Sequence, residues 1–102
     1  MSKKRIYISG PISGTDDWLE RFARAEADIE KMHAAIGEEV EVINPARIDM
    51  PKGTTWQQYI DISLQMLRGC DGIYMLANWR FSKGAKLERL YADGSGMVIF
   101  YE

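Results

Sequence analysis

The sequence has few of the residues that cross-link small domains or bind metal ions. Cys70 is the only cysteine and His33 the only histidine among 102 residues. An internal disulfide, a cysteine metal cluster, a histidine metal site and a histidine-based triad are therefore excluded. We expect no metal and no cofactor. A lone cysteine is typical of a reducing compartment, and we interpret Cys70 as a small, buried apolar side chain.

Neither sign of charge predominates, and the sequence has no long apolar run. Thirteen Lys and Arg residues and fifteen Asp and Glu residues are mixed along the chain, with a formal net charge of -2. The sequence offers no broad basic face for a nucleic-acid polymer. The first residues, MSKKRIYISGP, contain an apolar run that is too short for a signal peptide or a membrane span. We expect a cytoplasmic protein with a single domain over residues 1–102 that buries roughly 60 to 70% of its unfolded surface.

Apolar periodicity predicts strands that alternate with helices. Expected strands cover residues 5–9, 40–43, 72–76 and 97–101. Expected helices run from an N-cap at Thr15 to Gly37, from Thr54 or Thr55 to about Gly69, and over residues 82–93. The first helix has an apolar face at steps of four and three residues, made by Trp18, Phe22, Ala25, Ile29, Met32 and Ile36. This order predicts a small, doubly wound α/β domain, in which helices cover both faces of a parallel sheet of four or five strands.

In such sheets, ligands bind beyond the carboxyl ends of the strands. This rule selects three loops, namely GPISG at residues 10–14, Asn44-Pro45, and ANWRFS at residues 77–82. GPISG fits neither the P-loop nor the dinucleotide pattern, and it is either a plain turn or a cradle for a phosphate or sugar. Trp79 and Phe81 either stack on a base or close the core.

Glu88 is the most unusual residue of the third predicted helix. It falls in the middle of the side that carries Gly84, Ala85, Leu87, Tyr91 and Ala92. An unpaired buried carboxylate costs several kcal/mol. Glu88 is therefore salt-bridged, lies on a less buried face than the pattern indicates, or is functional. Asp61 falls on the polar side of the second helix, and Asp71 precedes the third strand as a turn or capping residue.

Three stretches, IYISGPISG at residues 6–14, YIDISLQMLRGCDGIYML at residues 59–76 and SKGAKLERLYA at residues 82–92, together resemble the nucleoside 2-deoxyribosyltransferase superfamily. The resemblance is to short, often phage-borne members without assigned activity and to the branch that hydrolyses 2'-deoxynucleoside 5'-monophosphates. It implies a flavodoxin-like fold and an active site made by Tyr7, Asp61 and Glu88. Glu88 would attack the anomeric carbon, Asp61 would assist the departing base, and Tyr7 would hold Glu88 ionised and aimed.

The resemblance also implies a substrate and a binding site. Ser82 stands where the monophosphate hydrolases have a phosphate-contacting serine, so hydrolysis is favoured over base transfer. The implied ligand is a nucleoside or nucleotide, and the expected binding residues are Ser9, Gly10, Pro11, Ile12, Ser13, Gly14, Asn78, Trp79, Ser82 and Gly84.

Two departures from the family pattern keep alternatives open. Leu90 replaces a glycine two residues after the glutamate. The chain ends at Glu102, without the later segment that helps to close the site in larger members, so we expect a homodimer that completes it. A nucleotide-binding module without turnover and a purely structural protein with a salt-bridged Glu88 are the other two hypotheses.

Overall fold

The chain folds as alternating strands and helices in a computed structural model that describes residues 3–12, 17–48 and 50–102. The elements are β1 (Lys4–Ser9), α1 (Trp18–Ala35), β2 (Val40–Ile43), α2 (Trp56–Arg68), β3 (Gly72–Met75), α3 (Lys83–Gly94) and β4 (Val98–Tyr101). Short 3-10 helices, η1 (Pro45–Arg47) and η2 (Trp79–Phe81), follow β2 and β3. The predicted α/β alternation is confirmed.

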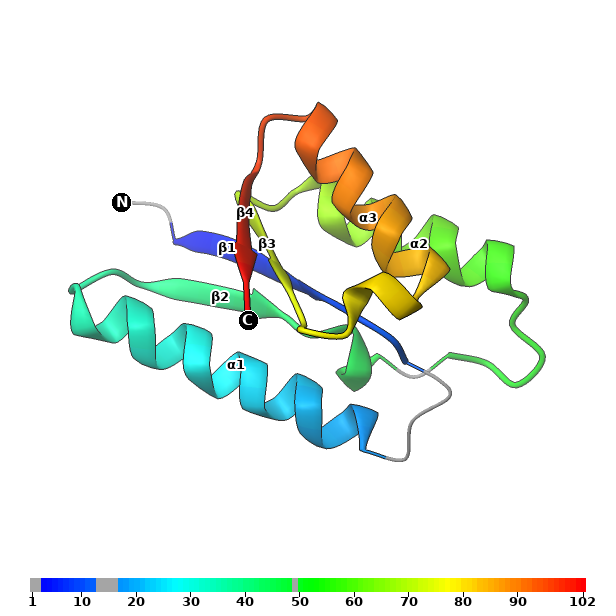
Figure 1. The fold of residues 1–102 in the computed structure, drawn as a ribbon, viewed down its shortest axis with the longest axis horizontal. Helices are drawn as coiled ribbons and strands as arrows, with labels where there is room; N and C mark the ends of the chain where they lie inside the picture. Colours follow the sequence, from blue (N-terminus) through cyan, green and yellow to red (C-terminus); the bar gives the residue numbers. More distant parts are fainter. Residues whose placement is uncertain (1–2, 13–16, 49) are drawn as a thin grey trace.

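The four strands form one parallel sheet in the order β2-β1-β3-β4. In the central strand β1, Tyr7 is paired with Ile43 of β2 and with Ile73 of β3. Helix α1 lies on one side of the sheet, and α2 and α3 lie together on the other (Figure 1). The chain leaves β1 for β2 on one side and then crosses to β3 on the other, so the strand order reverses between β1 and β3. This is the expected small, doubly wound arrangement, and the reversal marks where ligands bind in such sheets.

Strand β1 sends alternate side chains to two separate cores. Ile6 and Ile8 pack toward α1 in one cluster with Phe22. Tyr7 faces the other way and packs with Leu67 and with residues of β3 and α3. Since β1 is covered on both faces, its residues 6–9 are all buried. Even-numbered Ile6 and Ile8 face α1, and odd-numbered Tyr7 and Ser9 face α2 and α3.

The starts of α2 and α3 are fixed by side-chain caps. The Thr55 hydroxyl accepts a hydrogen bond from the Gln58 N–H at 3.1 Å, and the Gln58 side chain accepts one from the Thr55 N–H at 2.9 Å. The Ser82 hydroxyl accepts from the Ala85 N–H at 3.1 Å. These caps satisfy N–H groups that have no partner within a helix, and they confirm the predicted starts of both helices.

The first helix differs from the prediction at its end. It stops at Ala35, and Met32 and Ile36, which were expected on its apolar face, are 46% and 68% exposed. The buried stripe runs through Glu26 and His33 instead. The prediction of an apolar face is therefore wrong for Met32 and Ile36, and the helix is shorter at its end than predicted. The expected N-cap, Thr15, lies outside the described residues.

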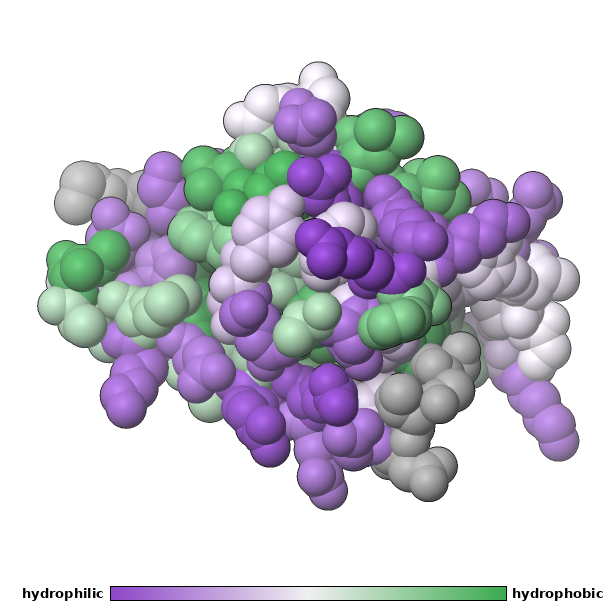
Figure 2. All heavy atoms as spheres, viewed as in Figure 1, coloured by the Kyte–Doolittle hydropathy of each residue, from purple (hydrophilic) through white to green (hydrophobic). Residues whose placement is uncertain are grey.

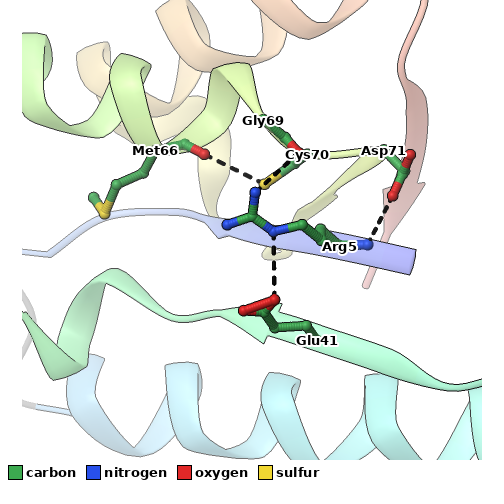
Figure 3. Close-up of polar contacts among 6 residues, drawn as sticks. All are labelled: Arg5, Glu41, Met66, Gly69, Cys70 and Asp71. Carbon is green, nitrogen blue, oxygen red and sulfur yellow. Dashed lines mark hydrogen bonds and ion pairs between the residues drawn. The ribbon is translucent and has the colours of Figure 1, made fainter. Parts of the chain in front are cut away.

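The amino edge of the sheet is tied together by polar contacts (Figure 3). The Arg5 N–H donates to Asp71 Oδ2 at 2.9 Å, and the Arg5 guanidinium donates to the Gly69 carbonyl at 3.2 Å. Arg5 also forms a 3.4 Å ion pair with Glu41. Cys70 is buried beside them. Asp71 is thus the turn residue that was expected, at the edge opposite to the strands' carboxyl ends.

The surface is mostly polar over α1. Purple, hydrophilic side chains project from the lower edge in Figure 2, where α1 lies in the same view of Figure 1. Green, apolar atoms are more frequent in the upper part of the view, near α3, and Leu90 of that helix is 65% exposed. Within the described residues, no helix combines the length and the apolar character needed to cross a bilayer.

Candidate functional site

Glu88 is buried on the face of α3 that meets the sheet. The buried residues of α3 are Ala85, Glu88 and Ala92, and Glu88 itself is 4% exposed. Leu87, expected on the same side, is 39% exposed and lies at its margin. The small side chains one turn before and one turn after leave room for the carboxylate against β1.

Both carboxylate oxygens of Glu88 accept hydrogen bonds from strand β1. The Tyr7 hydroxyl donates to Oε2 at 2.7 Å, and the Ser9 hydroxyl donates to Oε1 at 2.6 Å. Tyr7 and Ser9 are two residues apart on the same strand, so both side chains point to the face that α3 covers. The ion pairs found among the described residues do not include Glu88. The salt-bridge interpretation of this residue is therefore wrong for the described part of the chain.

The environment of Glu88 shifts the pKa values of the groups around it. Burial raises the pKa of Glu88 above 4.5, while the hydrogen bonds from Ser9 and Tyr7 oppose this rise. Burial and then the charge of Glu88 raise the pKa of Tyr7 well above 10. Burial thus favours the neutral forms of both Glu88 and Tyr7, whereas the hydrogen bonds from the Tyr7 and Ser9 hydroxyls favour the ionised form of Glu88.

A cavity of about 580 Å³ opens at the carboxyl ends of the strands, and Gly84 of α3, one turn before Glu88, is part of its lining. This volume is within the range of small-molecule sites. Its walls are the loop after β1, the segment after β2, and the first turns of α2 and α3, which meet at the lower right of Figure 1. The described lining residues are Pro11, Ile12, Trp18, Pro45, Ile48, Met50, Pro51, Gly53, Thr54, Thr55, Trp56, Tyr59, Phe81, Ser82, Lys83 and Gly84.

Two lining residues connect the cavity to Glu88. Gly84 lies one turn before Glu88 on α3, and Ile60 Cδ1 would lie 2.9 Å from a Cβ built on it. Tyr59 of α2 lies near enough that the charge of Glu88 contributes to raising its pKa, after the larger effect of burial. Glu88 itself is not among the lining residues. It therefore lies behind the inner wall, next to Tyr59 and Gly84.

The outer part of the cavity is aromatic and carries one cation. Lys83 Nζ lies 4.5 Å from the centre of the Trp56 ring. Phe81, also at this rim, is 90% exposed. Lys83 is the single charged side chain among the described lining residues. A flat apolar ligand with a negative group matches these walls.

The wall after β2 is held by a second buried carboxylate. Glu26 of α1 accepts a hydrogen bond from the Asn44 side-chain amide at 3.1 Å and forms an ion pair with Arg47 at 2.8 Å. The Asn44 oxygen accepts from the Ala46 N–H at 2.9 Å. These contacts fix η1 and therefore the position of Pro45, which lines the cavity.

The structure brings several predicted binding residues to this place. Pro11, Ile12, Ser82 and Gly84 line the cavity, and Ser9 contacts Glu88 rather than the cavity. Gly10 is needed for close packing, because a Cβ there would lie 2.6 Å from Leu76 Cδ1. Ser13 and Gly14, also predicted, lie outside the described residues.

Asp61 is not brought together with Glu88. It is exposed and lines a different hollow with Lys52 and Gln58. The reason is rotational: at about 100° per residue, the α2 residue that turns toward β1 and α3 is Ser63, which is 0% exposed. The Ser63 hydroxyl donates to the Ile60 carbonyl at 3.0 Å and lowers the pKa of Glu88. A serine thus faces the carboxylate from α2.

Trp79 and Asn78 also lie apart from the cavity lining. The guanidinium carbons of Arg80 and Arg89 lie 5.3 Å and 5.2 Å from the centre of the Trp79 ring, which also packs near Tyr101. Trp79 therefore packs between arginines. Asn78 Oδ1 is buried and has no hydrogen-bond partner among the described residues. Leu90, which departs from the glycine of the superfamily that the sequence resembles, is 65% exposed and does not belong to the buried face of α3.

Sequence reasoning missed four residues of the site: Tyr59, Ser63, Trp56 and Lys83. Trp56, Tyr59 and Ser63 recur at steps of three and four, so they share one face of the second helix, but this spacing alone indicates no function. A signal was present for Lys83, because it directly follows the capping serine at a predicted ligand edge. The described residues contain no group of three His, Cys, Asp or Glu side chains that could hold a metal ion.

One protein family matches the chain. The family model described as Domain of unknown function (DUF4406) matches residues 4–101, and the chain belongs to this family. The matched region spans every strand and helix of the sheet, including Tyr7, Ser9 and Glu88. The search of the curated proteins found no match.

Proposed function

We propose that this DUF4406 protein cleaves the N-glycosidic bond of a 2'-deoxynucleoside or its 5'-monophosphate, with Glu88 as the nucleophile. The observation that carries the proposal is the state of Glu88. It is buried, both oxygens accept hydrogen bonds from hydroxyls, and a cavity of ligand size is lined by Gly84, one turn before it on α3. A merely structural carboxylate is normally paired with a cation. The resemblance of the sequence to the nucleoside 2-deoxyribosyltransferase superfamily supports the same reaction.

The proposed chemistry is a displacement at the sugar. One Glu88 oxygen forms a bond to the anomeric carbon as the bond from that carbon to the base nitrogen breaks, and the base leaves with the electron pair. Water then attacks the glycosyl ester, which releases the sugar and regenerates the carboxylate. The hydroxyls of Tyr7 and Ser9 hold the carboxylate in one orientation, and Glu88 must be ionised to react.

The cavity walls support a nucleotide ligand. Trp56 and Phe81 offer flat apolar surface for a base. The Ser82 hydroxyl and Lys83 lie at the start of α3, where an anion is favoured by the helix dipole and the lysine charge. A 5'-phosphate would be bound there, as expected of the monophosphate hydrolases. We therefore favour hydrolysis over transfer to a second base.

The test is to incubate the protein with each deoxynucleoside 5'-monophosphate and to measure free base by chromatography. We expect release with at least one of them and a loss of at least about a thousandfold in Glu88→Gln, because the amide is no nucleophile. Asp93→Asn removes an exposed acid from the same helix and should release base at the normal rate. Release that survives in Glu88→Gln would sink the proposal. A second free base added to the assay separates transfer from hydrolysis.

A second candidate is a nucleotide-binding module with the same pocket and no turnover. The position of Asp61 favours it, because the acid expected to assist the departing base is exposed beside another hollow. This candidate predicts that a nucleotide raises the melting temperature of the protein while no base is released over long incubation.

We also propose that the protein is a cytoplasmic homodimer. The lone buried Cys70 is compatible with a reducing compartment. Phe81 at the cavity rim is 90% exposed, so a second copy could cover it and complete the site. Light scattering after gel filtration measures the mass directly, and a monomer at assay concentration contradicts the dimer.

A further inference from the structure

Tyr59 is the hydroxyl-bearing aromatic residue in the cavity wall. It is half-buried and lies on the second turn of α2, with the lining residues Thr55 and Trp56 on the turn before it. Tyr7, the other phenol near Glu88, is 0% exposed and already donates to Glu88. Of the two phenols, Tyr59 is therefore the one that a bound ligand can reach.

The proposed reaction needs a hydrogen-bond donor for the departing base. A base that leaves from a sugar carries developing negative charge, which a nearby hydrogen-bond donor stabilises. No carboxylic acid is found among the described residues that line the cavity. Asp61 is two residues after Tyr59, about 200° around the helix, and lies at the other hollow.

The hydroxyl of Tyr59 is suited to be a donor. Burial raises its pKa, and so does the charge of Glu88, so the phenol is protonated at neutral pH. A neutral phenol beside a carboxylate donates a hydrogen bond and does not compete as an anion. Ser63, the other α2 hydroxyl near Glu88, is 0% exposed and donates to the Ile60 carbonyl.

We propose that Tyr59 donates a hydrogen bond to the base of the bound nucleotide, at the end of the cavity next to Glu88, and so takes the place expected for Asp61. This inference rests on the proposed nucleotide ligand but not on turnover. In the reaction, the electron pair of the broken bond stays on the base, the Tyr59 proton stays on its oxygen, and the base takes up a proton from water after it leaves.

The test is calorimetric titration of the full chain with each of the four deoxynucleoside 5'-monophosphates, at 25 °C and neutral pH. We expect Tyr59→Phe to weaken the tightest of them about three- to tenfold, the range of one hydrogen bond. Asp61→Asn, the matched control on the same helix, should stay within about twofold of the unchanged protein. An effect of Tyr59→Phe below about twofold, or an equal effect of Asp61→Asn, overturns the inference.

A second pair of variants separates loss of the hydrogen bond from loss of the fold. Tyr59→His keeps a ring N–H donor, and Tyr59→Leu keeps only apolar bulk. We expect the histidine variant to bind more tightly, and the reverse order counts against Tyr59 as a donor. Binding that depends on Tyr59 without any base release refutes the proposed reaction and leaves this inference standing. Absence of binding by the unchanged protein to all four nucleotides refutes both.

Discussion

The Ser9 hydroxyl lies 2.6 Å from the Glu88 carboxylate, although 79 residues separate them in the chain. Ser9 is the last residue of β1 and Glu88 lies on the second turn of α3. The contact joins the central strand to the last helix at the edge where the cavity opens. It gives the site a direct dependence on pH, because a hydroxyl that donates to a carboxylate favours the ionised form.

Removal of that hydroxyl should shift the pH profile of base release. The hydrogen bond from Ser9 lowers the pKa of Glu88 against the opposing effect of burial. In Ser9→Ala, the pKa of Glu88 rises further, so the acid limb of kcat/KM moves to higher pH. We expect the rate at pH 6 to fall more than the rate at pH 8. Ser95→Ala, an exposed serine after α3, is the control. An acid limb at the same pH in Ser9→Ala would show that Glu88 is not the titrating group.

Replacement of Glu88 should stabilise the fold at neutral pH. The pKa of Glu88 in the folded chain is raised above 4.5. Its contribution is therefore fully present below pH 4.5 and is lost as pH rises through the folded-state pKa. Glu88→Gln removes this loss. A change of 1 kcal/mol shifts the Tm of a domain of this size by about 4–8 °C, so we expect a gain of several degrees at pH 7.5.

The difference in Tm between Glu88→Gln and the unchanged protein should shrink toward pH 4. Thermal melts by circular dichroism at both pH values measure it. Glu30→Gln, an exposed acid on α1, should show a constant difference. A difference that grows toward acid pH would contradict the raised pKa of Glu88.

Asn44, which holds η1 in the cavity wall, should contribute to the free energy of unfolding. Its amide donates to Glu26 and accepts from the Ala46 N–H, so Asn44→Ala removes one hydrogen bond from the buried Glu26 carboxylate and one from the part-buried Ala46 N–H. We expect a loss of about 1–3 kcal/mol in the free energy of unfolding, measured by urea titration. Asn78→Ala should cost less, because Asn78 Oδ1 has no partner to lose among the described residues. Equal costs would contradict the role of Asn44 in holding the wall.

Ligand binding should be visible in the fluorescence of Trp56. Lys83 lies over this indole in the open cavity, and a base that stacks on Trp56 must displace it. We expect nucleotide to change the emission of the unchanged protein and of Trp79→Phe, because Trp79 packs between two arginines apart from the cavity. Trp56→Phe should lose most of the change. Because Trp18 also lines the cavity, a full change that persists when both Trp18 and Trp56 are replaced by Phe would place the ligand elsewhere.

The fold and the central carboxylate could be predicted because they depend on local periodicity. Alternation along residues 5–9 separates Tyr7 from its isoleucine neighbours, and helical spacing places Glu88 on the inner side of α3. The partners of Glu88 are harder to predict, since the Ser9 contact depends on the exact height of α3 above β1. Helical spacing already places Asp61 on the polar side of α2 and Ser63 on the other side. Only the resemblance assigned Asp61 to the site.

The order of the strands has a consequence for how the protein is made. β1, the second strand across the sheet, lies between β2 and β3, and its pairing with β3 joins Ile6 to Gly72. During synthesis, β1 can pair with β3 only after more than two thirds of the chain has been made. Contacts between residues so far apart in the sequence slow folding. Glu88 meets Tyr7 and Ser9 later still, so a nascent chain or fragment that stops before α3 contains both hydroxyls of β1 but not the carboxylate that they bind.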